Sequence, residues 1–446
     1  MSQVRFSYTS GDLRQLARDV LAHALKGGAS ACETEVSEGY GQNVTVRKGA
    51  VETIEYNRDK GIGVTAYLGQ QKGFASTSDL SARALRDTVD KALSIARFTA
   101  ADPCAGLPDA SRLATKEVDL DLFHPWDLAI ERAIDIAKGA EAAAFAVDPR
   151  ITNSEGASVS VQHNQFAAAN TLGFIGGFPT TRHYVSCGVI AGRNSGMQRD
   201  DWYSSARDAA DLASATAVGR YAAERALSRL KAKQIGTRTV PVLFEAPLAA
   251  SLIGSFVAAV SGGSLYRKSS FLLDSLGKQV FSGIVDLAER PMLKKQLGST
   301  PFDDEGVATV DRQVVKSGVL QGYFLSTYSS RKLGMQTTGN AGGNHNLILK
   351  SGRHDFKGML GLMGTGLLVT DLIGQGINMV TGDYSRGAFG YWVEKGEIRY
   401  PVEEITIAGN LAEMFMGISA IGNDVVVRGS RQCGSILIDH MTIAGN

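Results

Sequence analysis

The chain has 446 residues, of which 44% are hydrophobic and 20% charged, and its 46 basic residues balance 45 acidic ones. This length predicts roughly two to three domains, with ample apolar material for their cores. The net charge of +1 gives no electrostatic reason to expect nucleic acid or an anionic membrane as the main partner.

The cysteines and the apolar stretches indicate the compartment. Cys32, Cys104, Cys187 and Cys433 are widely spaced and form no CxxC pair, which favours reduced thiols over a disulfide framework. The N-terminal stretch turns polar at once, without the apolar core of a signal peptide. The most apolar long stretch is broken by polar residues and glycines, so it is a poor membrane span. We therefore expect a cytoplasmic protein with no membrane or nucleic-acid partner.

The first part of the chain begins with a helical pattern and continues with an alternating one. An amphipathic pattern predicts a helix over residues 12–26. The alternating residues that follow, up to residue 77, predict a meander of about five antiparallel strands. We expect its turns near Gly41, residues 48–49, residues 60–61 and residues 69–70.

Further helices and strands complete this half of the chain. The periodicity of the apolar residues predicts helices over 79–98 and 127–145, β structure over 151–204, and a long Ala-rich helix over 206–233. Helices combined with antiparallel strands indicate an α+β domain, which we place at residues 1–235.

The second half of the chain is mostly β-type with many turns. A buried strand is expected to lead into an apolar helix over residues 247–263. Hairpins are predicted around residues 316–318 and 395–396, and further strands near the C-terminus. The overall prediction is an α+β fold: an N-terminal antiparallel sheet with helices, and a C-terminal β-rich domain over residues 236–446 that contains a buried helix.

The helix predicted over residues 247–263 carries no His, Cys, Asp, Glu or Lys. One face is a continuous apolar stripe of Ala249, Leu252, Ile253, Phe256, Val257 and Val260. The other face consists of the small residues Ser251, Gly254, Ser255 and Ala258. A helix of this kind is usually buried on both sides, so the pattern by itself favours a core helix.

Three other segments could carry chemistry. The three carboxylates of FDDEG, residues 302–306, could bind a cation or shift a pKa, but a solvated acidic turn is favoured. Cys433 could be a nucleophile or a metal ligand, but a buried thiol is favoured because no base is visibly paired with it. The Gly- and Asn-rich loop 337–346 either grips an extended peptide main chain or is an ordinary mobile loop.

Long stretches of the sequence resemble one family. They are SLYRKSSFLLDSLGKQVF, PFDDEGVATVDRQVVKSGVLQGYFLSTYSSRKLGMQTTGNAGGNHN, NMVTGDYSRGAFGYWVEKGEIRYPVEEITIAGN, ISAIGNDVVVRGS and, near the N-terminus, RKGAVETIEYNRDKGIGVTAY. With them the chain resembles the TldD/PmbA family of metalloproteases, and within it the PmbA/TldE branch, which lacks the HExxxH motif. The resemblance covers nearly the whole chain.

The resemblance has a consequence for the metal. In the catalytic subunit of this family, HExxxH stands on a helix just before the Arg-Lys-Ser-Ser segment, and two histidines and a distant cysteine hold zinc. The corresponding positions of this chain are Gly254, Ser255 and Ala259, with Cys433 in place of the cysteine. One cysteine cannot hold a catalytic zinc ion. We therefore expect no catalytic residue and no metal in this chain, and zinc on the partner subunit.

The resemblance implies the non-metal-binding subunit of a TldD/TldE-type heterodimeric metallopeptidase, inactive without a TldD-like HExxxH subunit. Such peptidases act on unstructured peptides and are associated with antitoxin degradation and microcin maturation. Peptide binding is expected at Thr338, Gly339, Asn340 and His345.

Two other functions stay open. The chain could be a homodimeric, non-enzymatic protein that binds peptides or partners, in keeping with the family's historical label as a modulator of DNA gyrase. It could also be an independent hydrolase that uses Cys433 with His345 or His440, although the sequence shows no base paired with the thiol.

Overall fold

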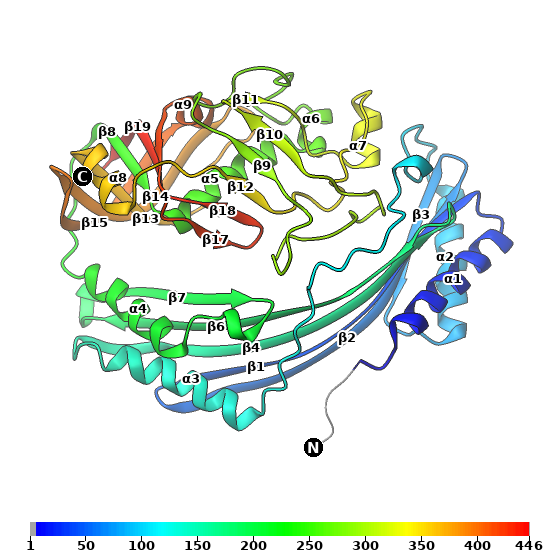
Figure 1. Cartoon of the computed structure of the whole chain (residues 1–446), viewed down its shortest axis with the longest axis horizontal. Helices are drawn as coiled ribbons and strands as arrows, with labels where there is room; N and C mark the ends of the chain where they lie inside the picture. Colours follow the sequence, from blue (N-terminus) through cyan, green and yellow to red (C-terminus); the bar gives the residue numbers. More distant parts are fainter. Residues whose placement is uncertain (1–5, 446) are drawn as a thin grey trace. The chain divides into compact units, whose positions relative to one another are not determined.

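The computed structural model describes residues 6–445, which form two compact units (Figure 1). Of the described residues, the first unit comprises 6–228, 294–296 and 301–309, and the second comprises 229–293, 297–300 and 310–445. The expected domain boundary, between residues 235 and 236, lies near the point where the first unit ends. Patterns along the sequence did not indicate the two short returns to the first unit.

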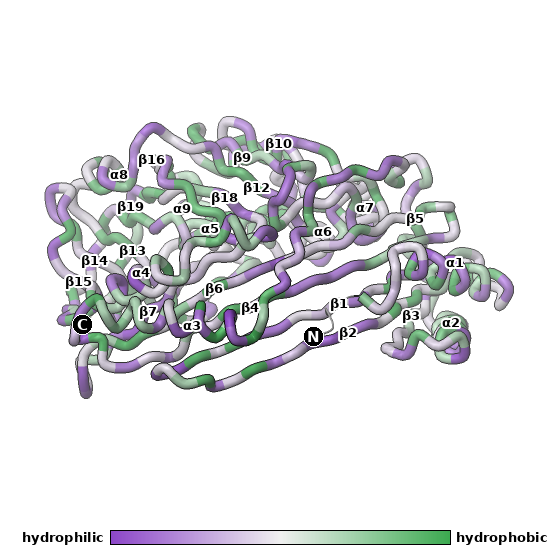
Figure 2. The backbone as a smooth tube through the Cα atoms, turned by 60° about the horizontal axis from the view of Figure 1, so that its bottom comes forward, coloured by the Kyte–Doolittle hydropathy of each residue, from purple (hydrophilic) through white to green (hydrophobic). Residues whose placement is uncertain are grey.

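The first unit is built on one antiparallel sheet with the strand order β3-β2-β1-β4-β6-β7, in which β5 also pairs with β4 (Figure 1). Its strands are β1 Ala31–Arg47, β2 Ala50–Leu68, β3 Gln71–Thr77, β4 Ile151–Asn170, β5 Ile175–Gly176, β6 Pro179–Ala191 and β7 Gln198–Ala206. The long strands β1 and β2 lie side by side, and both contain hydrophilic as well as hydrophobic stretches (Figure 2).

Four α-helices pack on this sheet, two near each end of the long strands. They are α1 Ser10–Lys26, α2 Ala82–Phe98, α3 Ile130–Phe145 and α4 Ala215–Ser228, and short 3-10 turns lie at Ala110–Arg112, Asn194–Gly196 and Ala209–Asp211. The helices α1 and α2 share a core with Cys32 and Val36 of β1, while α3 packs on β1 and β4 and α4 on β6 and β7. Strand residues two apart point to the same face, so β1 presents alternate residues to its helices.

Two expectations for this unit were wrong. The segment 32–77 forms three long strands rather than about five, because the chain runs straight through Gly41 and residues 60–61. A Cβ at position 41 would lie 2.4 Å from the Val161 carbonyl oxygen, so this glycine permits close strand contact rather than a turn. The long helix expected over 206–233 is limited to α4, because β7 extends to Ala206 and Asp208 caps the following 3-10 turn.

The second unit contains two further sheets, and in one of them the strands close into a ring. This sheet has the order β15-β14-β13-β8-β19-β16, and β15 pairs again with β19. Its strands are β8 Arg238–Phe244, β13 Gly366–Ile373, β14 Asp383–Glu394, β15 Glu397–Asn410, β16 Ile418–Ile421 and β19 Ile436–Ala444. The hairpin expected around residues 395–396 is confirmed as the β14–β15 turn.

The other sheet of this unit has the order β11-β10-β9-β12-β18-β17. Its short strands are β9 Leu287–Glu289, β10 Arg312–Lys316, β11 Val319–Leu320, β12 Leu347–Leu349, β17 Val426–Arg428 and β18 Arg431–Cys433. The helices of the unit are α5 Ala246–Ala259, α6 Gly262–Tyr266, α7 Thr327–Lys332, α8 Phe356–Met363 and α9 Leu411–Met416. The hairpin expected around residues 316–318 is confirmed between β10 and β11.

The buried helix expected in this unit is confirmed as α5. Its whole apolar stripe belongs to the main core of the unit, and the helix packs against β13, β17 and β18. The helix ends at Ala259 and not at residue 263, and Gly262 and Gly263 open α6. The face of small residues is not fully buried, since Gly254 and Ser255 are partly exposed and Ala258 is exposed.

The fold class is thus the expected α+β arrangement, with an antiparallel sheet and helices in the first unit and a β-rich second unit around a buried helix. Between residues 6 and 445, no helix combines the length and the apolar character needed to cross a membrane.

Candidate functional site

The short-stranded sheet of the second unit aligns residues that are far apart in the sequence. Arg428 pairs with Arg431, Arg431 with Leu347, Leu347 with Glu289, and Glu289 with Arg312. Paired residues of neighbouring strands project to the same face of a sheet. Three arginines and one glutamate therefore form one lateral row, which runs over β17, β18, β12, β9 and β10. We call it the arginine row.

At one end of the arginine row lie the positions that resemble the metal motif. Gly254 and Ser255 are partly exposed on α5, and Ala259 is completely buried. The Ser255 hydroxyl donates to the Ser251 carbonyl oxygen at 3.2 Å, and the Ala259 carbonyl accepts from Ser270 Oγ at 2.6 Å. None of the three side chains is a zinc ligand.

The guanidinium of Arg431 lies against α5 at Gly254. A Cβ at position 254 would be 3.1 Å from Arg431 Nη1 and 3.2 Å from its Cζ, so this glycine lets the cation approach the helix closely. Burial lowers the pKa of Arg431, yet a guanidinium keeps its proton in proteins. The position that resembles the first metal ligand therefore faces a positive charge.

Cys433 lies two residues further along β18 and is completely buried. Its Sγ contacts the Ala246 carbonyl oxygen at 3.6 Å, and burial raises the pKa of the thiol to about 12. A protonated buried thiol is a poor nucleophile and a poor metal ligand. Among residues 6–445, neither His345 nor His440 is hydrogen-bonded to this thiol.

The residues at these positions do not fit a zinc site. Cys433 is the single side chain among them that could ligate zinc, whereas a catalytic zinc ion needs three protein ligands. In the part of the chain that the structure describes, no group of three or more His, Cys, Asp or Glu side chains is arranged to hold a metal ion. We therefore derive no chemical step through a metal in this chain.

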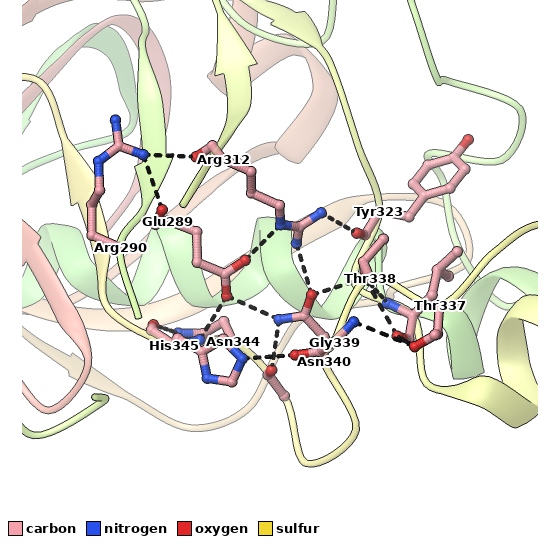
Figure 3. A network of polar contacts seen from close by, with 12 residues as sticks. Glu289, Arg290, Arg312, Tyr323, Thr337, Thr338, Gly339, Asn340, Asn344 and His345 are labelled. Carbon is pink, nitrogen blue, oxygen red and sulfur yellow. Dashed lines mark hydrogen bonds and ion pairs between the residues drawn. The ribbon is translucent and has the colours of Figure 1, made fainter. Parts of the chain in front are cut away.

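The other end of the arginine row is a buried polar network around Glu289 (Figure 3). The Glu289 carboxylate accepts hydrogen bonds from Arg312 Nε at 2.6 Å, from Asn340 Nδ2 at 2.9 Å and from the His345 backbone N–H at 2.7 Å. The Arg312 guanidinium also donates to the Tyr323 carbonyl and to Asn340 Oδ1. The charge of Glu289 is therefore neutralised within the network.

The expected peptide-binding residues form the loop side of this network (Figure 3). Thr338 Oγ1 accepts from the Leu325 backbone N–H at 2.8 Å and donates to Asn340 Oδ1 at 2.8 Å. His345 Nε2 lies 2.8 Å from the Gly339 carbonyl oxygen. The four residues are thus brought together, but the side chains of Thr338, Asn340 and His345 are engaged within the protein. These hydrogen bonds anchor the loop at its base.

The acidic segment 302–306 lies in the first unit and differs from a simple solvated turn. Asp303 is buried, and its carboxylate accepts from the backbone N–H groups of Glu305 and Val307. The segment shares a hollow of about 200 Å³ with Glu33 and Glu35. Burial, and secondarily a nearby carboxylate, raises the pKa of both glutamates. The glutamates with raised pKa values therefore lie on β1 and not in the acidic segment itself.

Sequence reasoning missed Glu289, Arg312 and Arg431 as parts of a site. The partner of Arg312 is Glu289, which lies 23 residues earlier in the chain. No local motif marks these residues, because the register of four strands, β10, β9, β12 and β18, brings them together.

Family models match most of the chain. Residues 32–96 match PmbA/TldA metallopeptidase domain 1, residues 123–230 the central domain of the same family, and residues 237–445 its C-terminal domain. The last of these contains α5, the arginine row and the Glu289 network.

Curated relatives agree with these matches. The chain is 47% identical to metalloprotease PmbA of Escherichia coli O157:H7 over 435 residues, which cover 97% of each chain. It is 46% identical to a PmbA homologue of Haemophilus influenzae, covering 98% of this chain and 96% of that one. The identity to a TldD homologue of the same organism is 24%, over 84% of this chain and 82% of that one.

Solved structures share the fold. A Bacteroides thetaiotaomicron protein described as a modulator of DNA gyrase superposes with a TM-score of 0.93 at 26% identity, covering 98% of this chain and 100% of the other. TldE from Thermococcus kodakarensis superposes with a TM-score of 0.84 at 19% identity, covering 96% and 100%. From the family models and the two PmbA relatives, we conclude that the chain belongs to the PmbA/TldD family of metallopeptidases, with higher identity to PmbA proteins than to TldD proteins.

Proposed function

We propose that this chain is the non-metal-binding subunit of a TldD/TldE-type peptidase, and that it assembles with an HExxxH-bearing, TldD-like subunit to cleave unstructured peptides. One observation carries the proposal. In a domain of a metallopeptidase family, the positions that resemble the metal motif are Gly254, Ser255 and Ala259, and a guanidinium lies against the first of them. Zinc and the attacking water would then belong to the partner.

The role of this chain in such a complex is to hold and enclose the substrate. A rigid loop with a fixed backbone suits an extended peptide better than a side-chain pocket does, since main-chain groups are the same in every peptide. We propose that Thr338, Asn340 and His345 support peptide binding by fixing the shape of the loop. Gly342 and Gly343, which are exposed at its tip, are the positions where a peptide main chain could approach.

The test is a comparison of the isolated chain, the isolated TldD-like subunit and the mixture of both. Zinc is measured by mass spectrometry after gel filtration, and hydrolysis is followed with a fluorescent unstructured peptide. We expect substoichiometric zinc and no turnover for this chain alone, and zinc-dependent turnover for the complex. Stoichiometric zinc with full turnover in the isolated chain would disprove the proposal.

A matched control separates assembly from chemistry. A TldD-like partner in which the motif glutamate is replaced by glutamine should still form the complex but should stay inactive. If the complex with that partner hydrolyses peptide, the chemistry resides in this chain after all. If this chain forms a stable homodimer whose peptide affinity does not change on adding the partner, the non-enzymatic binding function is favoured instead.

The family resemblance of the sequence also implies biological roles. We propose antitoxin degradation and microcin maturation from the family resemblance, and a cytoplasmic location from the widely spaced cysteines. Degradation assays with an unfolded antitoxin and with a microcin precursor, each with and without the partner, would distinguish these roles.

A further inference from the structure

Arg431 and Arg312 are both partly buried arginines of the arginine row, but they differ in the partners of their side chains. Arg312 has a carboxylate, a carbonyl and an amide as partners. Among residues 6–445, Arg431 makes no ion pair and no hydrogen bond with its side chain, and its Nε is enclosed without a partner. A partly buried guanidinium without a counter-ion is unfavourable, because burial removes hydration that nothing replaces.

A second positive charge lies next to it. Arg428 is the direct cross-strand partner of Arg431 in the β17–β18 hairpin, on either side of Gly429 and Ser430. Like charges at directly opposed positions of two strands are destabilising. The hairpin thus carries two arginines on the face of β18 that also bears Cys433.

The carboxylates of Glu289 and Asp424 are both engaged with partners other than Arg431. Glu289 stands two strands away in the row, about 10 Å by the usual strand spacing, and both its oxygens accept hydrogen bonds within its own network. Asp424, which precedes the hairpin, accepts from the backbone N–H and the hydroxyl of Ser435 at 2.9 and 3.0 Å. Cys433 contributes no negative charge because its thiol is protonated.

We propose that Arg431, flanked by Arg428, binds a carboxylate of the extended peptide that this subunit holds beside Gly254 of α5. A guanidinium presents a planar pair of donors that matches the two oxygens of a carboxylate. Because Nε is enclosed, Nη1 and Nη2 are the donors that a ligand can reach. In an extended peptide, a carboxylate comes either from the C-terminus or from an Asp or Glu side chain.

The inference deepens the proposed function, since it rests on peptide binding by this subunit. The substrate class becomes unstructured peptides with a carboxylate at a fixed place. The positive charge beside Gly254 then serves substrate recognition in this chain, where the resemblance would otherwise place a metal.

The test uses the full chain and three fluorescently labelled ten-residue peptides built on one Gly/Ser/Ala sequence. The first has a C-terminal amide and no acidic residue, the second has a free C-terminal carboxylate, and the third has a C-terminal amide and one internal glutamate. Dissociation constants are measured by fluorescence anisotropy at low salt. We expect at least one carboxylate peptide to bind on the order of tenfold or more tightly than the neutral peptide.

Variants of the hairpin assign the effect to Arg431. Arg431→Gln should abolish the preference for the carboxylate peptide while leaving the weaker affinity for the neutral peptide unchanged. Arg431→Lys, which keeps the charge but not the planar fork, should give an intermediate preference. Arg353→Gln removes one positive charge from an exposed position of the same unit and should change nothing.

Each result either supports or overturns the inference. Equal affinity of the wild-type chain for all three peptides overturns it, and this comparison needs no variant to fold. An Arg431→Gln variant that weakens all three peptides equally, or that loses the heterodimer without changing peptide preference, also overturns it. Failure of the proposed function appears separately, as missing partner-dependent hydrolysis, because the anisotropy experiment measures equilibrium binding by this chain alone.

Discussion

At the scale of single residues, one buried carboxylate holds separate segments of the second unit together through its hydrogen bonds. Glu289 is almost completely buried, and it accepts three hydrogen bonds, one from Arg312 of β10 and two from the loop 337–346. We expect Glu289→Gln to lower the free energy of unfolding by about 3 kcal/mol, because Arg312 would stay buried without its counter-ion. Urea unfolding followed by circular dichroism measures this loss.

The matched control for this substitution is Asp311→Asn. Asp311 lies 3.5 Å from Arg290 in an exposed ion pair on the strand edge next to Arg312. Its loss should cost less than about 0.5 kcal/mol, since exposed ion pairs contribute little. Equal effects of the two substitutions would show that the Glu289 network is not the stabilising element that its burial implies.

Cys433 is the other residue whose role can be tested directly. Cys433→Ala should reduce the free energy of unfolding by about 1 kcal/mol, as is usual for a small loss in a packed core. Peptide hydrolysis by the complex should not change, because the thiol is buried and its pKa is raised to about 12. Loss of hydrolysis in a variant that remains folded and assembled would restore the cysteine-dependent mechanism.

At the scale of secondary-structure elements, two helices of the first unit approach each other closely at a glycine. A Cβ at Gly219 of α4 would lie 1.9 Å from the Ala140 carbonyl oxygen of α3, whereas a Cβ at Gly139 of α3 would meet nothing within 4 Å. The two substitutions to alanine should therefore have opposite signs. Gly219→Ala should destabilise the protein by about 2 kcal/mol through overpacking, and Gly139→Ala should stabilise it by up to about 1 kcal/mol through helix propensity.

Thermal unfolding of the two variants measures this contrast. A stabilising Gly219→Ala substitution would mean that α3 and α4 can separate without loss, and that their tight packing does not fix the end of the sheet. A destabilising Gly139→Ala substitution would show that this position has a contact that its open surroundings do not reveal.

Elements were predictable from the sequence where local signals decide them. The periodicity of apolar residues located α1, α2 and α5. Glycine-containing turn sequences located the β10–β11 and β14–β15 hairpins, and in the structure Ser317 and Lys395 of these turns have positive φ. The meander was over-divided because a glycine inside a long strand gives the same sequence signal as a turn. A glycine inside a strand is distinguished from a glycine in a turn by the neighbouring strand that contacts it, and at Gly41 this contact comes from the Val161 backbone.

At the scale of the whole molecule, two buried histidines make stability depend on pH. His163 and His183 lie on neighbouring strands of the first unit and are almost completely buried. The His163 ring stacks on Tyr40 with centroids 4.5 Å apart, and neither of its nitrogens has a hydrogen-bond partner. Burial lowers the pKa of His163 to about 4, and it also lowers the pKa of His183.

Because the folded-state pKa lies below the unfolded value of about 6.5, the unfolded chain binds protons more readily. Stability from these groups is therefore complete above pH 6.5 and falls as the pH decreases towards 4. For His163 the loss over this window is roughly 3 kcal/mol by proton linkage. Urea unfolding at a series of pH values, followed by the fluorescence of Trp126 beside His183, measures it.

His163→Phe should flatten this pH dependence, because phenylalanine can stack on Tyr40 but cannot take up a proton. His440→Gln, at an exposed position, is the control and should leave the pH dependence as it is in the wild type. If His163→Phe keeps the full loss of stability between pH 6.5 and 4, other groups are responsible for it.

The sequence by itself determined the fold class, most helices and hairpins, the family resemblance and the absence of metal ligands at Gly254, Ser255 and Ala259. These depend on local periodicity, turn chemistry and residue identity, which are written along the chain. Only the tertiary structure decided that Arg431 lies against Gly254, that Glu289 neutralises Arg312, and that the loop 337–346 is fixed by this network. Charge pairing and burial depend on which strands adjoin, and strand register joins residues that are tens of positions apart in the sequence.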